Sequence, residues 1–143
     1  MSERNLKLPL FLTRLSIFGF LLPWQIARFT GPDLINTVAT THYKVPVSST
    51  LSTISGVLMI VLLLAFLVGF KKKISYGLVF LIHAAGTIMT IPSLIKGAKF
   101  LITSDLSNGF QPTALFLAAV PAAFAMLLLY RLRDEDTMFS LNK

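Results

Sequence analysis

Four long apolar runs follow one another along the chain, and the segments between and beyond them hold 17 of the 19 charged residues. A helix needs about 20 mostly apolar residues to cross the ~30 Å hydrocarbon core of a bilayer. Backbone groups in lipid must pair within their own segment, so runs of this length form helices. The pattern therefore predicts four membrane-spanning helices, at residues 8–29, 51–70, 74–95 and 112–130.

A membrane β-barrel is excluded by the same pattern. Its strands would appear as ~10-residue segments in which apolar and polar residues alternate, whereas every residue from Val57 to Leu64 is apolar. We therefore expect an all-α fold, an integral membrane four-helix bundle. The bundle forms a single transmembrane domain over residues 1–143, with outer loops at residues 30–50 and 96–111.

The first outer loop contains a helix-start signal. The segment Asp33–Ala39 follows Gly31 and Pro32, and proline is favoured in the first turn of a helix. The apolar residues of this segment either lie on the membrane surface or cap the bundle.

The distribution of basic residues predicts the orientation of the bundle. With both termini cytoplasmic, nine of the 13 lysines and arginines lie on the inner side and four on the outer side, as the positive-inside rule requires. Lys71–Lys73 forms a tight inner connection between the second and third spans. The first span is expected to be retained, because Arg14 interrupts its apolar stretch and no small-residue cleavage site follows.

Composition excludes several classes of function. The net charge of +7 comes from basic residues at span ends, where they meet the headgroups of membrane lipids, so we expect lipid partners and no nucleic acid. The absence of cysteine removes thiolate metal sites and thiol redox chemistry. No nucleotide-binding or metalloprotease motif occurs, and no acid lies inside the four spans. We therefore expect no metal site, no catalytic residue and no proton-coupled transport.

Arg14 is the one basic residue placed well inside a predicted span. A charge there is costly unless it pairs or reaches the interface, and the nearby acids are Glu3, Asp134, Glu135 and Asp136. The structural interpretation is an arginine that meets a phosphate or these acids. The functional interpretation is an anion or lipid headgroup site between helices.

His83 is a second polar residue at mid-membrane depth. Thr87 and Thr90 follow at four and seven positions, so the three side chains share one helix face that should point into the bundle. The structural interpretation is a neutral histidine bonded to a backbone carbonyl or a threonine. The functional interpretations are a hydrogen-bond donor to a quinone carbonyl, a proton relay, or a metal or haem ligand.

Trp24 and Arg28 lie at the outer end of the first span. Tryptophan is common at membrane interfaces, so it needs no function there. With His42, Tyr43 and Lys44, however, the two residues are candidates to line an outward-facing ligand pocket.

Several local patterns together resemble the DoxX-like family of small membrane proteins. They are Arg14 early in the first span, Ser55–Val57 opening the second, Phe66–Phe70 before a basic turn, the segment His83–Pro92, and the end of the fourth span at Leu129–Asp134. The resemblance implies a compact four-helix bundle of a bacterial inner (cytoplasmic) membrane, associated in some members with thiosulfate:quinone oxidoreductases or other membrane redox complexes. Family members often carry a glutamate partway along the second span, where this chain is apolar around Met59.

Three functions follow from these observations. The first is a non-catalytic accessory subunit of a larger membrane complex, with other membrane subunits or further copies of itself as partners. The second is a quinone-interacting component of a membrane oxidoreductase, with quinone as cofactor and His83, Arg28 and Trp24 as its residues. The third is a lipid- or small-molecule-binding protein. A cavity that reaches His83 would favour the second or third, and an alanine-packed interior with exposed apolar flanks would favour the first.

Overall fold

The computed structural model describes residues 5–104, 106–107 and 116–141, and every regular element in these ranges is helical. The prediction of an all-α chain is confirmed. The elements are α1 (Lys7–Thr30), α2 (Pro32–Val38), a π-helical turn η1 (Ala39–Tyr43), α3 (Ser49–Leu67), α4 (Lys72–Met89), α5 (Ile91–Thr103) and α6 (Ala119–Arg131).

Two of these helices, α1 and α3, are long and apolar enough to cross a membrane. They agree closely with the predicted spans at residues 8–29 and 51–70. Ser48 caps the N-terminus of α3, because its side-chain oxygen accepts a hydrogen bond from the N–H of Leu51. The helix ends at Leu67, and Gly69 then turns the chain at a φ of +63°.

The third predicted span, residues 74–95, is wrong at its C-terminal end. α4 ends at Met89, and α5 follows it at an angle of 66°. The cause is Pro92, which has no backbone N–H and whose ring would clash with the carbonyl four residues earlier if α4 continued. Much of the predicted outer loop at residues 96–111 is therefore the helix α5. The two helices count as a third crossing only if they form one broken span.

The fourth apolar run is helical over its described part. A turn of 3₁₀-helix at residues 116–118 leads into α6, and the apolar helical stretch covers Phe116–Arg131. Residues 112–115 of the predicted span lie outside the described residues. The part of the chain that the structure describes thus contains two candidate spans, or three with the bent pair.

The loop between α1 and α3 is largely helical. α2 begins at Pro32, as the helix-start signal predicts, and η1 continues it to Tyr43. α2 packs against α1 and α3.

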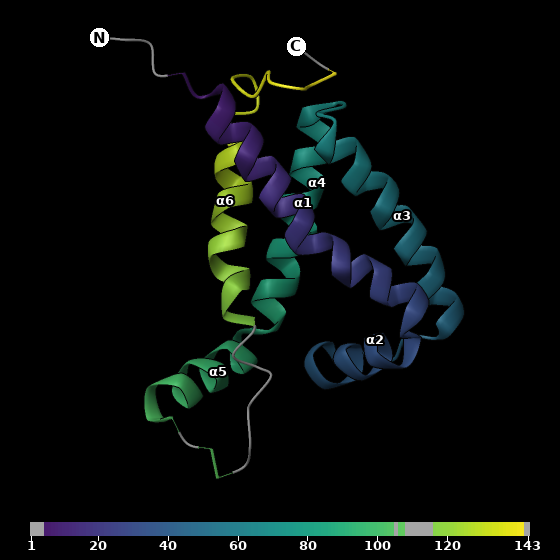
Figure 1. Cartoon of the computed structure of the whole chain (residues 1–143). Coiled ribbons are helices and arrows are strands. Elements are labelled where there is room, and N and C mark those ends of the chain that lie inside the picture. Colours follow the sequence, from purple (N-terminus) through teal and green to yellow (C-terminus); the bar gives the residue numbers. More distant parts are fainter. Residues whose placement is uncertain (1–4, 105, 108–115, 142–143) are drawn as a thin grey trace.

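Four helices pack as a ring in which α1 contacts α3 and α6, and α4 contacts the same two helices. Figure 1 shows α4 and α6 side by side, with α3 diverging from α4 away from the turn that joins them. The hydrophobic part of the buried core consists of Leu10, Ile17, Leu21, Leu63, Phe66, Tyr76, Val79, Met126 and Leu129.

The start of α1, the α3–α4 turn and the described C-terminal residues lie together at one end of the molecule (Figure 1). α2 and α5 lie at the opposite end. The two ends are therefore built from different elements, and each holds some of the polar residues that the sequence singles out.

Candidate functional site

Arg14 lies on the buried face of α1. It follows Leu10 by four residues and precedes Ile17 by three and Leu21 by seven, so helical periodicity places all four on one side. Its side chain is 0% exposed. A guanidinium this deeply buried must find all its partners inside the protein.

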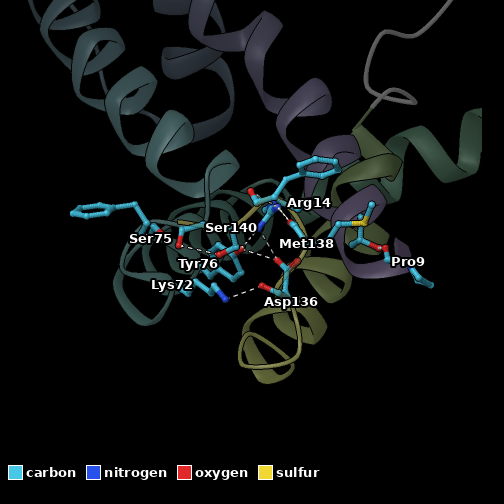
Figure 2. Close-up of polar contacts among 12 residues, drawn as sticks. Pro9, Arg14, Lys72, Ser75, Tyr76, Asp136, Met138 and Ser140 are labelled. Atoms are coloured by element: carbon cyan, nitrogen blue, oxygen red, sulfur yellow. Dashed lines mark hydrogen bonds and ion pairs between the residues drawn. The ribbon is translucent and has the colours of Figure 1, made fainter. Parts of the chain in front are cut away.

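The guanidinium of Arg14 donates to four oxygen atoms of the same chain. Nη1 lies 3.0 Å from Oδ2 of Asp136 and 2.9 Å from the hydroxyl of Tyr76. Nη2 donates to the carbonyl oxygens of Met138 at 2.6 Å and Phe139 at 3.2 Å. Figure 2 shows the arginine projecting into the loop formed by the C-terminal residues. This arrangement leaves no exposed surface on Arg14 for a lipid phosphate or another anion.

Asp136 is the acid that pairs with Arg14, and its side chain is also 0% exposed. Oδ2 accepts a second hydrogen bond, at 2.7 Å, from the hydroxyl of Tyr76. Its backbone carbonyl accepts one from Nζ of Lys72 at 2.7 Å. By contrast, Asp134 is 85% exposed and lies 3.9 Å from Arg133.

These contacts hold residues 136–141 against the end of the bundle, and we call this segment the C-terminal strap. Besides the bonds to Arg14, the N–H of Leu141 donates to the carbonyl of Val68 at 2.8 Å. The hydroxyl of Ser140 donates to the carbonyl of Gly69 at 3.4 Å. The strap therefore joins α1, the α3–α4 turn and α4 at one point.

Sequence reasoning included Asp136 among the acids available to Arg14 but missed Tyr76 and Lys72. A signal was present, because these two residues are four apart at the start of α4 and so share one face.

The predicted polar face of α4 is present, and its hydrogen bonds are made within the chain. Nε2 of His83 lies 2.9 Å from the carbonyl oxygen of Ala119, so Nε2 carries the proton. Thr87 donates to the carbonyl of His83, and Thr90 to those of Gly86 and Thr87. This hydrogen bond to a backbone carbonyl is the contact that the structural interpretation of His83 describes.

Arg28 connects α1 to α3. Its Nη1 donates to the hydroxyl of Ser55 at 2.8 Å, and its Nε to the side-chain oxygen of Gln25 at 3.0 Å. In the other direction, the hydroxyl of Ser52 donates to the Arg28 carbonyl at 3.0 Å. Gly56 lets the helices approach, since a Cβ there would come 2.9 Å from the ring of Phe29.

Trp24 faces a different neighbour from Arg28. Its ring lies 6.4 Å from that of Phe116, which in turn lies 4.8 Å from the ring of His42. Nδ1 of His42 is 2.6 Å from the hydroxyl oxygen of Ser93 on α5. The aromatic group of Trp24, His42 and Phe116 therefore joins α1, η1 and the start of the fourth apolar segment.

We expect the pKa of His42 to lie below its ordinary value of 6.5, because burial and the charges of Lys44 and Lys96 disfavour the imidazolium. Because the pKa of His42 is lower in the folded chain than in the unfolded chain, a falling pH protonates the unfolded chain at a higher pH than the folded one. The free energy of unfolding therefore decreases as the pH drops below 6.5. NMR titration of the imidazole measures this pKa directly. Lys96→Gln should raise it, and Lys73→Gln, at the other end of the molecule, should not. A pKa above 6.5 in the unmodified chain would contradict the assignment.

Within the described ranges, no group of three or more histidine, aspartate or glutamate residues is placed to hold a metal ion. An open pocket of about 630 Å³ is lined by Asn5, Lys7, Leu8, Thr137 and Met138, beside the C-terminal strap and at the far end of the bundle from the His83–Ala119 contact.

No family model, no curated protein sequence and no solved structure matches this chain. The resemblance to the DoxX-like proteins therefore stays a prediction.

Proposed function

We propose that this protein is a DoxX-like, non-catalytic accessory subunit of a membrane complex. The observation that carries the proposal is the use of the polar groups on α4. His83, Thr87 and Thr90 were three of the five candidates for ligand binding, with Trp24 and Arg28, and their side chains bond to backbone carbonyls of α4 and α6. The His83 bond joins α4 to α6 and the two threonine bonds lie within the α4 segment, so each of these side chains already uses a ring N–H or a hydroxyl hydrogen inside the chain.

The packing supports the same proposal. Ala119 is buried where α6 meets α4, and Ala122 and Ala125 pack against the core. The outer faces of the helices, in contrast, carry large exposed apolar side chains: Leu58 and Val61 on α3, Leu81 on α4 and Phe124 on α6. Such faces suit lipid tails and the helices of partner subunits.

The orientation is part of the proposal. We place both termini on the cytoplasmic side of a bacterial inner membrane, because the basic residues favour it. The start of α1 and the described residues after α6 lie at the same end of the molecule as the lysine-rich α3–α4 turn (Figure 1), and this supports an even number of crossings. Cysteine labelling at Ser104→Cys tests the placement, since the chain has no cysteine of its own. Labelling by an impermeant reagent from the outside is expected, and labelling only from the inside would reverse the orientation.

A quinone-interacting component is the second candidate. It rests on the aromatic group of Trp24, His42 and Phe116, which joins three segments near one end of the bundle. A quinone ring stacks on such side chains. Arg28 was also named in the sequence-based quinone hypothesis, but it does not belong to this aromatic group. Its guanidinium bonds to Ser55 on α3.

The test is purification of the tagged chain from its native membrane in mild detergent, with mass spectrometry of both proteins and extracted quinones. Partner chains in constant ratio, without stoichiometric quinone, are expected. His83→Gln should leave that ratio unchanged, since its amide can still donate to the Ala119 carbonyl. A monomer without partners would contradict the accessory role. Stoichiometric quinone that is lost in Trp24→Leu would favour the second candidate.

A further inference from the structure

α4 is long enough to reach the far side of the hydrocarbon core without α5. Its 18 residues extend about 27 Å at 1.5 Å per residue, close to the ~30 Å thickness of the core. α5 begins at this point and turns by 66° from the direction of α4. A helix that starts at the edge of the core and turns this far runs close to the plane of the membrane surface.

The two sides of α5 have different surroundings. Leu94 and Gly97 are buried against the rest of the protein. Ile91, Ile95 and Ile102 are 46%, 65% and 84% exposed. At 100° per residue these isoleucines fall within one narrow sector, so they form a continuous apolar stripe along the helix.

Two lysines accompany the isoleucine stripe. Lys96 and Lys99 are exposed, and Lys99 lies on the helix surface directly beside the stripe. Burial of both ammonium groups in hydrocarbon would be costly, which disfavours a re-entrant path for α5 through the core. At the interface, the same side chains reach the phosphate layer while their stems stay among the acyl chains.

We propose that α5 is an interfacial helix that binds a surface of anionic lipids. Its isoleucine stripe enters the upper part of the acyl chains, and Lys96 and Lys99 bind the lipid phosphates. Exposed apolar residues flanked by basic ones are the complement of such a surface. The inference rests on the membrane placement of α1 and α3 and on the further assumption that α4, which qualifies as a candidate span only together with α5, crosses the core by itself. It does not depend on the accessory role.

The test uses tryptophan fluorescence in the full-length chain, which has a single tryptophan, Trp24. In a Trp24→Phe background, Ile102→Trp introduces the probe on the stripe, and Phe124→Trp introduces a matched one in the middle of α6. Both proteins are reconstituted in vesicles of equal phosphatidylcholine and phosphatidylglycerol. The lipids carry bromine either near the headgroup or near the chain end.

We expect the probe on α5 to be quenched most by bromine near the headgroup, and the probe on α6 most by bromine near the chain end. Strongest quenching of the α5 probe by deep bromine would mean a re-entrant helix and would overturn the proposal. Quenching of that probe by aqueous iodide alone would mean contact with water, and protection from all three quenchers would mean a protein partner. Either result would also overturn it.

The lipid charge is tested separately. The emission of the α5 probe should shift to shorter wavelength when phosphatidylglycerol is added to phosphatidylcholine vesicles, and Lys96→Gln with Lys99→Gln should abolish this shift. Lys71→Gln with Lys73→Gln, at the other end of the bundle, is the control and should retain it. An unchanged shift without Lys96 and Lys99 would contradict the role of these lysines.

Discussion

Replacement of Asp136 by asparagine is expected to lower the free energy of unfolding by about 3–5 kcal/mol, the usual cost of removing one partner from a buried ion pair. The asparagine has nearly the same shape, so the loss comes from charge. It leaves the guanidinium of Arg14 buried, with a neutral amide 3.0 Å from Nη1 where a carboxylate had been. Titration with a denaturing detergent, followed by the fluorescence of Trp24, measures the change.

The matched control is Asp134→Asn. Asp134 lies two residues away, is 85% exposed and is 3.9 Å from Arg133. Exposed pairs of this kind contribute about 0–1 kcal/mol, so this variant should unfold almost like the unmodified chain. An equal free energy of unfolding for the two asparagine variants would show that the Arg14–Asp136 pair does not hold the fold together.

Replacement of Gly69 by alanine is the second change with a large expected effect. The φ of +63° is one that a residue with a Cβ adopts at a cost of about 1–2 kcal/mol. The added Cβ would also collide with the side chain of Ser140 and lie 3.0 Å from Nη1 of Arg14. The C-terminal strap must move to accommodate it, so we expect a loss of at least about 2 kcal/mol in total.

Hydrogen exchange shows whether the strap has moved. The N–H of Leu141, which donates to Val68, should exchange faster in Gly69→Ala. Gly19→Ala is the control, because nothing lies within 4 Å of a Cβ at that position and alanine favours the helix. If Gly69→Ala were as stable as Gly19→Ala, the close packing of strap and turn would be refuted.

Hydropathy predicted the helices whose ends coincide with the ends of apolar runs. α1 and α3 are of this kind, and their predicted limits are close to the observed ones. The bend between α4 and α5 was missed because Pro92 lies inside an apolar run, and hydropathy does not register a missing N–H. The proline was the available signal.

The polar residues were predicted less completely. The spacing of His83, Thr87 and Thr90 correctly predicted one shared face, because helical periodicity determines it. The choice of Asp136 over Asp134 and Glu135 depends on irregular turns after α6, where no periodicity applies. The partner of Arg14 could therefore be narrowed to a few acids but not identified.

The central claim is that Arg14 and Asp136 act as one structural unit that fixes the C-terminal strap on the bundle. A double-mutant cycle with Arg14→Met and Asp136→Asn tests it most directly, because the double variant contains neither charge. We predict that the double variant loses less free energy of unfolding than the two single variants together, by about 2–3 kcal/mol. Additivity to within about 0.5 kcal/mol would contradict the claim.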